Sequence, residues 1–226
     1  MKIKYCLPII KNTKEEVLQE VLQSLRSYDF FEVWVDYIEN RDENFVQDLI
    51  GQFKEKLIIV SRRQNLEEVS MNLEKRLKII SLLENSQSMI DLDILMQKDE
   101  LDQIKNKKMK VKTIISYHNY QETPDDSKLK EIIDTMKIYD PEVFKIATKC
   151  NNQKDALRLL GLLLAMKEKD VKAIILGMGE SGIITRIFGT IWGNEMIFAP
   201  KNLAESSAPG QLTKEQLETI FRVLGK

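Results

Sequence analysis

The chain has 226 residues, of which 34 are Lys or Arg and 35 are Asp or Glu, so its formal net charge is −1. A hydrophobic content of 43% excludes an intrinsically disordered protein, and only 9 Gly and 5 Pro exclude a collagen-like or linker composition. Because no basic excess is available to hold a phosphate backbone, we expect no nucleic-acid partner.

The apolar runs are too short for targeting or membrane insertion. The N-terminal segment MKIKYCLPIIKNTKEE lacks the apolar length of a signal peptide, and the longest apolar stretch, Ala156 to Met166, is interrupted by Arg158. The two cysteines, Cys6 and Cys150, do not make a disulfide framework. We therefore expect a cytoplasmic protein with no membrane partner. Since the chain begins almost directly at its first expected strand, we also expect no hairpin closing the bottom of the fold.

Short β-rich runs alternate with segments of helical periodicity along the whole chain. The expected strands are Ile3–Ile9, Phe31–Ile38, Leu57–Arg62, Met89–Leu95, Val111–His118, Val143–Thr148, Val171–Leu176 and Met196–Ala199. The expected helices are Glu16–Tyr28, Leu66–Leu83, Lys128–Ile138, Lys154–Lys167 and Lys214–Leu224, with shorter ones after the second, fourth and seventh strands.

This alternation predicts an α/β fold, a (β/α)8 TIM barrel that forms a single domain over residues 1–226. A doubly wound open sheet is the competing architecture, because it shows the same alternation with fewer strands. In either case the functional residues should lie at the carboxyl ends of the strands.

Alternation within the strands predicts an unusually charged inner face. The residues that share it are Glu32, Trp34, Asp36, Asp91, Asp93 and Lys145. Buried charges are costly unless they are paired or used, so a structural layer of ion pairs and a reactive site are both possible interpretations. For Lys145, apolar neighbours should lower the pKa and leave a free amine that can form a Schiff base.

The candidate acid–base residue is His118, the only histidine of the chain, at the end of the fifth strand in Ser116-Tyr117-His118-Asn119-Tyr120. One histidine and two distant cysteines do not make a convincing transition-metal site. A magnesium site built from the carboxylates of Glu32, Asp36, Asp91 and Asp93 is a weaker alternative.

Two late loops have features of a binding site. Gly177-Met178-Gly179-Glu180-Ser181-Gly182 matches a dinucleotide-binding pattern, but it lies near the end of the chain and lacks the acidic residue expected about 20 residues later. With Arg186 one turn into the next helix, the loop better suits capture of a substrate anion. The segment Ser206-Ser207-Ala208-Pro209-Gly210-Gln211 is typical of a hinged lid.

Taken together, these residues resemble the type I 3-dehydroquinate dehydratases, the Schiff-base enzymes of the shikimate pathway. The matching segments, in the order of the family, are Glu32-x-x-x-Asp36, Ser116-Tyr117-His118-Asn119-Tyr120 with Thr123-Pro124, Phe144-Lys145-Ile146-Ala147, Met178-Gly179-x-x-Gly182-x-x-Thr185-Arg186, and Ser207-Ala208-Pro209-Gly210-Gln211. The resemblance implies a barrel without cofactor or metal, usually a homodimer, that dehydrates 3-dehydroquinate to 3-dehydroshikimate in aromatic amino-acid biosynthesis.

The resemblance also implies a role for each matching residue. Lys145 would form an imine with the C3 ketone of the substrate, and His118 would move the protons. Arg186 would hold the substrate carboxylate. The other expected roles are hydroxyl binding by Glu32 and Arg62, lid contacts by Ser207 and Gln211, and ordering of the nearby basic groups by Asp36.

The sequence departs from the family pattern at two positions. Trp34 stands where the family usually has an arginine, and Asn65 stands near the usual place of a glutamate that orients the catalytic histidine. Arg63 or the carboxylates of Asp91 and Asp93 are candidates to compensate. Two alternatives to the dehydratase therefore stay open: a class I Schiff-base aldolase acting on a phosphorylated sugar, and a non-catalytic homologue that binds a related cyclic acid.

Overall fold

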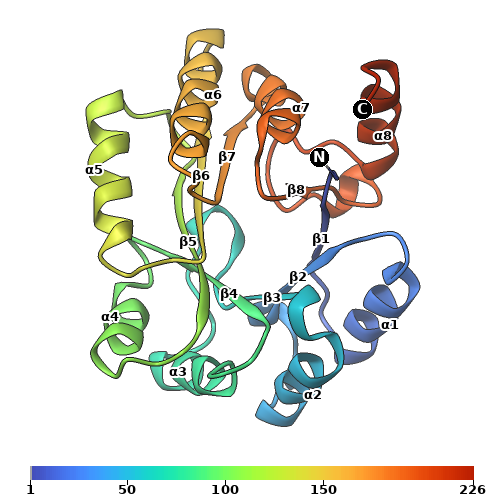
Figure 1. Cartoon of the computed structure of the whole chain (residues 1–226). Helices are drawn as coiled ribbons and strands as arrows, with labels where there is room; N and C mark the ends of the chain where they lie inside the picture. Colours follow the sequence, from blue (N-terminus) through green and yellow to red (C-terminus); the bar gives the residue numbers. More distant parts are fainter. Residues whose placement is uncertain (1) are drawn as a thin grey trace.

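The computed structural model describes residues 2–226, which contain eight β-strands and eight α-helices in strict alternation (Figure 1). The strands are β1 (Tyr5–Ile9), β2 (Phe30–Trp34), β3 (Leu57–Val60), β4 (Met89–Asp93), β5 (Lys112–Asn119), β6 (Val143–Lys149), β7 (Ala173–Met178) and β8 (Ile197–Phe198). The helices are α1 (Lys14–Ser24), α2 (Glu43–Phe53), α3 (Leu73–Leu82), α4 (Lys98–Asn106), α5 (Asp126–Lys137), α6 (Gln153–Lys167), α7 (Ile183–Trp192) and α8 (Lys214–Val223).

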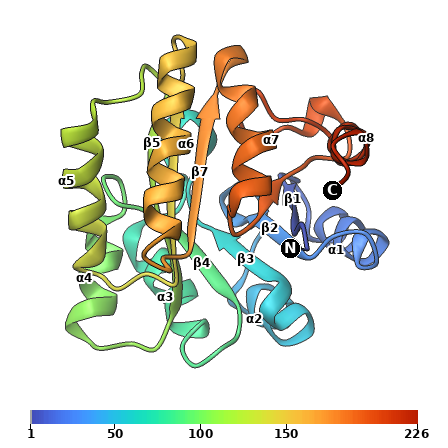
Figure 2. The ribbon, with the colours of Figure 1, turned by 45° about the horizontal axis from the view of Figure 1, so that its top comes forward.

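The strands form one parallel sheet that curls into a nearly closed barrel. Their order is β7-β6-β5-β4-β3-β2-β1-β8, so the chain visits neighbouring strands in sequence and β8 returns to β1. Between β7 and β8, the amide of Glu195 donates a hydrogen bond of 2.9 Å to the carbonyl of Ala173. Figure 2 shows α5, α6 and α7 running alongside the long strands β5 to β7. The predicted (β/α)8 barrel is confirmed, and the open doubly wound sheet is wrong.

The largest errors in the expected boundaries lie after β2 and β3. The second strand was expected to continue to Ile38, but it ends at Trp34 and a 3₁₀ turn covers Val35–Tyr37. Asp36 therefore does not continue the alternation of β2. The third helix begins at Leu73 rather than at Leu66, because the side chain of Asn72 accepts the amide of Lys75 and caps the helix there.

The inside of the barrel is apolar at its lower end and charged at its upper end. Inward side chains from seven strands or their N-terminal flanks form an apolar cluster of Cys6, Ile58, Met89, Ile114, Val143, Ile174, Leu176, Met196 and Phe198. A larger apolar core lies between the sheet and the helices. The ionisable groups are thereby placed at the carboxyl ends of the strands. Within residues 2–226, no helix has the length and hydrophobicity needed to cross a membrane.

Candidate active site

Lys145 on β6 is the centre of a buried ion-pair cluster. Its Nζ lies 2.7 Å from Oδ2 of Asp91 on β4 and 3.2 Å from Oε1 of Glu32 on β2. All three side chains are at most 7% exposed. Ser116, which pairs with Lys145 across β5 and β6, donates its hydroxyl to Oδ1 of Asp91 at 2.6 Å. The cluster joins inward residues that the strand alternation had placed on one face.

The ion pairs correct one expectation about Lys145. Burial alone would lower its pKa, but the charges of Asp91 and Glu32 outweigh burial and raise the pKa above its ordinary value. Conversely, burial would raise the pKa of Asp91, but Arg62 and Lys145 hold it well below its usual range. Lys145 is therefore an ammonium in the free protein, because its neighbours are carboxylates and not the apolar side chains that were expected.

His118 on β5 is held by Asp93 on β4. Its Nδ1 lies 2.8 Å from Oδ2 of Asp93, and its ring stacks on Tyr120 with 6.4 Å between centroids. Burial lowers the pKa of His118, although the hydrogen bond to Asp93 partly opposes this effect. A neutral imidazole whose Nδ1–H donates to Asp93 presents a basic Nε2, which suits general acid–base catalysis.

Arg62 and Trp34 extend the cluster on the other side of Asp91. The guanidinium of Arg62 pairs with Oδ1 of Asp91 at 2.9 Å, donates to its backbone carbonyl at 2.8 Å, and lies 5.6 Å from the ring centre of Trp34. The indole Nε1 of Trp34 donates to Oε2 of Glu32 at 2.8 Å. Trp34 thus supplies a donor to the carboxylate of Glu32, where the family usually has an arginine.

Arg186 in α7 carries a buried positive charge for which residues 2–226 provide no anionic partner. Its side chain is 1% exposed, and NH2 donates to the backbone carbonyl of Pro209 at 3.1 Å. Nε and NH1 of the same guanidinium are buried and have no hydrogen-bond partner within the described part of the chain, residues 2–226. Burial lowers the pKa of Arg186 to about 10, so the group is still charged at neutral pH. Such a group is suited to bind an anionic ligand, since an isolated buried charge is strongly unfavourable.

The segment after β8, residues 200–212, covers the mouth of the barrel and is called the lid below. Within it, Ser207 and Gln211 pair with each other: the amide of Ser207 donates to Oε1 of Gln211, and Nε2 of Gln211 donates to Oγ of Ser207, both at 2.9 Å. Gly210 has a φ of +78° and packs so closely on Gly179 that a Cβ would lie 2.9 Å from its carbonyl oxygen. The glycines therefore let the lid approach the loop after β7.

That glycine-rich loop is closed upon itself. A Cβ on Gly182 would lie 2.4 Å from the carbonyl carbon of Gly177, so the two glycines allow the loop to fold tightly into α7. The amide of Gly177 donates to Oγ1 of Thr185 at 2.7 Å, and that of Gly182 donates to the carbonyl of Gly179 at 3.0 Å. These amides are used internally, and the loop serves to position Arg186.

The expected site residues line one small cavity of about 30 Å³ beneath the lid. Its walls include Glu32, Lys145, His118, Arg186, Ser207 and Gln211, together with Trp34, Tyr120, Ala147, Leu176, Met178, Phe198 and Ala208. The structure thus brings together six of the eight residues selected from the sequence. Arg62 and Asp36 do not line the cavity. Arg62 contacts the cavity residue Trp34 and is linked to Lys145 through Asp91.

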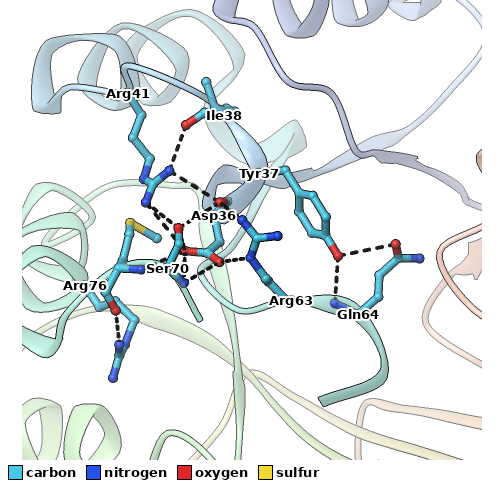
Figure 3. A network of polar contacts seen from close by, with 9 residues as sticks. Asp36, Tyr37, Ile38, Arg41, Arg63, Gln64, Ser70 and Arg76 are labelled. Atoms are coloured by element: carbon cyan, nitrogen blue, oxygen red, sulfur yellow. Dashed lines mark hydrogen bonds and ion pairs between the residues drawn. The ribbon is translucent and has the colours of Figure 1, made fainter. Parts of the chain in front are cut away.

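Asp36 instead lies in a separate polar network (Figure 3). Its carboxylate accepts Nε of Arg63 at 2.7 Å and the amides of Ser70 and Met71 at 2.9 and 3.0 Å, and Arg41 lies 3.7 Å away. This geometry agrees with the expected ordering of basic groups, but it places Asp36 behind the site. Arg63 is bound to Asp36, whereas Lys145 is bound to Glu32 and Asp91. Because these carboxylates lie in separate networks and already pair with cations, a magnesium site built from all of them loses support. Among residues 2–226, no group of three or more acidic, His or Cys side chains is arranged for a metal ion.

Sequence reasoning missed two residues of the site. The ring centre of Phe198 lies 4.2 Å from Nζ of Lys145, so a strand residue that looked like ordinary core contacts the charged amine. The alternation within the expected strand Met196–Ala199 was the available signal, because it places Met196 and Phe198 on one face. Gln64, which contacts the lid, gave no signal because it lies in an irregular turn.

Comparison with known proteins identifies the family. The family model described as Type I 3-dehydroquinase matches residues 5–226. The chain is 30% identical over 219 residues to a 3-dehydroquinate dehydratase from Coxiella burnetii, covering 97% of this chain and 92% of that protein. It is 31% identical over 225 residues to the 3-dehydroquinate dehydratase of Methanococcus vannielii, covering 97% of this chain and 99% of that protein.

Solved structures agree with this assignment. The crystal structure of the 3-dehydroquinate dehydratase from Geobacillus kaustophilus superposes with a TM-score of 0.84 at 21% identity, covering 100% of this chain and 92% of that one. The type I enzyme from Clostridium difficile, determined with covalent modified comenic acid, gives a TM-score of 0.81 at 25% identity, covering 99% and 92%. The chain belongs to the type I 3-dehydroquinase family.

Proposed function

We propose that this protein is a lyase that dehydrates 3-dehydroquinate to 3-dehydroshikimate, in the shikimate pathway, through an imine on Lys145. One observation supports this function most strongly: a single small cavity brings together a lysine, a neutral histidine held by a carboxylate, and an arginine that has no anionic partner among residues 2–226. The lysine suits the ketone of 3-dehydroquinate, the histidine suits the acidic proton on C2, and the arginine suits the carboxylate.

The first step requires the loss of a proton from Lys145, since its pKa is raised. The free amine then adds to the C3 carbonyl carbon, and the carbonyl oxygen leaves as water. The resulting iminium carries the positive charge that the ammonium carried before, so Asp91 and Glu32 stabilise it from the same positions. The two carboxylates therefore stabilise the nitrogen of Lys145 both as the ammonium and as the iminium, which gives the ion pairs a role in the reaction.

His118 then performs the proton transfers. Its Nε2 removes a proton from C2, and the electron pair of that C–H bond moves into the enamine, whose electron sink is the iminium nitrogen. The same proton goes to the hydroxyl on C1, the C1–O bond breaks, and water leaves. Hydrolysis of the conjugated imine returns the amine of Lys145 and releases the product. Asp93 holds the imidazole in the tautomer that these steps require.

The remaining residues bind and enclose the substrate. Arg186 pairs with the carboxylate, exchanging its bond to Pro209 for charge-assisted hydrogen bonds. Ser207 and Gln211 close the site from the lid, and Glu32 contributes at the ring hydroxyls. Arg62, which does not line the cavity, acts by holding Asp91 beside Lys145. Because a cavity of about 30 Å³ holds little more than one water molecule, the lid must open to admit the substrate.

The dehydratase is favoured over an aldolase that acts on a phosphorylated sugar. Two of the three glycine amides in the loop after β7, those of Gly177 and Gly182, already donate to Thr185 and Gly179, so neither is free for a phosphate. The chain also resembles a 3-hexulose-6-phosphate synthase from Salmonella typhimurium, but with 13% identity and a TM-score of 0.57, over 98% of each chain, that likeness shows only the fold. A non-catalytic homologue is disfavoured because the lysine and the histidine are both in place.

Turnover assays test the proposal. We expect 3-dehydroquinate to give a product with the ultraviolet absorbance of a conjugated enone, and we expect no cleavage of phosphorylated ketoses. His118→Ala should retain binding and lose at least about 10²-fold in kcat, the contribution typical of a positioned acid–base group. Binding of the substrate by wild-type protein without any product would favour the non-catalytic homologue.

We further propose a cytoplasmic homodimer. The outer faces of α6 and α7 support the dimer, because Leu157, Leu164, Ile184 and Trp192 are each at least 40% exposed there. The free cysteines Cys6 and Cys150 fit a reducing compartment. Light scattering should give twice the mass of the chain, and Trp192→Lys should give the monomer; a monomeric wild type would contradict the dimer.

A further inference from the structure

Gln64 in the loop between β3 and α3 connects two parts of the site that are far apart in the sequence. Its Nε2 donates to the backbone carbonyls of Ser206 and Ser207 in the lid, at 3.3 and 3.0 Å. Ser207 is also the residue whose amide and hydroxyl pair with Gln211. The single side chain of Gln64 therefore holds the backbone at Ser207, which in turn pairs with Gln211, and both residues line the cavity.

Gln64 is itself held in place by Tyr37 (Figure 3). Its backbone amide donates to the hydroxyl of Tyr37 at 3.1 Å, and that hydroxyl donates in turn to Oε1 of Gln64 at 3.4 Å. The guanidinium of Arg63 lies 4.7 Å from the ring centre of Tyr37. With Oε1 engaged by Tyr37, the amide group of Gln64 is oriented with its NH₂ toward the lid.

The loop that carries Gln64 is fixed at both ends by the same buried carboxylate. Asp36 binds Arg63 at the start of the loop and the amides of Ser70 and Met71 at its end (Figure 3). The loop is thus clamped as a unit, so that Gln64 is presented from a fixed platform and not from a free segment.

The other polar side-chain contacts of the lid include ion pairs and the bond from Arg186. Lys11 pairs with Glu205 at 2.6 Å, but both side chains are more than 20% exposed and salt screens such pairs. Arg186 donates to Pro209 only while it has no anionic ligand. Lys201 forms a second ion pair of the lid, 2.5 Å from Glu20, and Gly210 packs on Gly179. Gln64 adds two side-chain hydrogen bonds that depend neither on ionic strength nor on the occupancy of Arg186.

We propose that Gln64 is a positioning residue that latches the lid in its closed position and thereby places Ser207 and Gln211 over the cavity. The lid opens by breaking the two bonds from Gln64, and it closes by remaking them. The latch itself is a property of the free protein, whereas its effect on turnover rests on the proposed dehydratase function.

Hydrogen exchange in the protein without substrate tests the latch directly. Gln64→Met keeps the size of the side chain and removes the donor, and Gln52→Met on the exposed face of α2 is the matched control. Two lost hydrogen bonds should increase exchange of the backbone amides in residues 206–212 by about 25-fold, because each bond contributes a factor near five. Tyr37→Phe should have a smaller effect in the same direction, and the control should have none.

Kinetics separate positioning from a general loss of structure. In Gln64→Met we expect KM for 3-dehydroquinate to rise about 5- to 10-fold with kcat within about twofold of wild type, because an open lid costs binding before it costs chemistry. Unchanged exchange in the lid would overturn the latch even in a fully active enzyme. Faster exchange in a protein that never turns over 3-dehydroquinate would leave the latch standing and overturn the dehydratase.

Discussion

The Nδ1 atom of His118 lies 2.8 Å from Oδ2 of Asp93, on the neighbouring strand of the barrel. This contact supports the proposal that Asp93 compensates for the departure at Asn65, where the family usually has a glutamate that orients the histidine. Of the candidates for compensation, Arg63 is bound to Asp36 and Asp91 is bound to Arg62 and Lys145, whereas Asp93 faces His118. The orienting carboxylate is thus supplied from β4.

Asp93→Asn should damage turnover more than binding. The amide can present its NH₂ to Nδ1, which favours the imidazole tautomer with the proton on Nε2 and removes the base from the cavity. We expect kcat to fall by about 10²-fold or more, the range of acid–base contributions, with KM nearly unchanged. Steady-state kinetics beside Asp99→Asn, an exposed aspartate on α4, provide the comparison; a variant with wild-type kcat would remove Asp93 from the mechanism.

The titration of His118 should have its midpoint below pH 6.5, because burial lowers its pKa. As the chain has one histidine, its ring signal in proton NMR reports this group alone. Asp93→Asn should move the midpoint lower still, since the carboxylate raises the pKa. The unfolded chain binds the proton more readily, so the stability from neutral His118 is present above about pH 6.5 and is lost as the pH falls through the folded pKa. A midpoint above 6.5 would contradict this assignment.

Arg186→Met should stabilise the free protein while weakening substrate binding. The variant removes a buried charge that has no anionic partner, so we expect the melting temperature to rise by about 2–4 °C, equivalent to about 1 kcal/mol. Loss of the charge-assisted pair with the carboxylate should raise KM about 100-fold. Calorimetry and kinetics with Arg26→Met as a surface control separate the two effects; a lower melting temperature would indicate a structural role for Arg186.

Trp34→Arg should strengthen binding. Trp34 supplies one indole donor to Glu32, whereas an arginine supplies a fork of donors that can serve both Glu32 and a substrate hydroxyl. One added charge-assisted hydrogen bond corresponds to a fall in KM of about 10-fold, with little change in kcat. Trp34→Phe, which removes only the donor, should not lower KM. If KM of the arginine variant does not fall, the prediction that Trp34 limits substrate binding is contradicted.

The barrel and most of its site were predictable from the sequence because strand periodicity and strand order are local signals. Alternation placed Glu32, Asp91 and Lys145 on one face, and the structure joins them in one cluster. The alternation failed at Asp36, because β2 ends at Trp34. The carboxylate of Asp36 is held outside the sheet by hydrogen bonds from Arg63 and Ser70. Those partners lie in a different loop, and residue spacing does not contain that information.

The electrostatic state of Lys145 was also beyond the sequence pattern. The prediction of a lowered pKa counted its neighbours in the chain, which are apolar, but its neighbours in space are two carboxylates. The contact of Gln64 with the lid was missed for the same reason, since it joins residues 142 positions apart. Chemistry at strand ends follows from local pattern, whereas pairing between loops requires the folded chain.

Borohydride trapping tests the central claim most directly, that Lys145 forms an imine with 3-dehydroquinate. The protein is incubated with substrate, reduced, and analysed by intact mass and peptide mapping, with Lys145→Arg as the variant that keeps the charge beside Asp91 and Glu32. The account predicts one adduct on the peptide that contains Lys145 in wild type, together with product formation, and neither in the variant. A wild-type protein that turns over the substrate without an adduct, or with an adduct on another lysine, would contradict it.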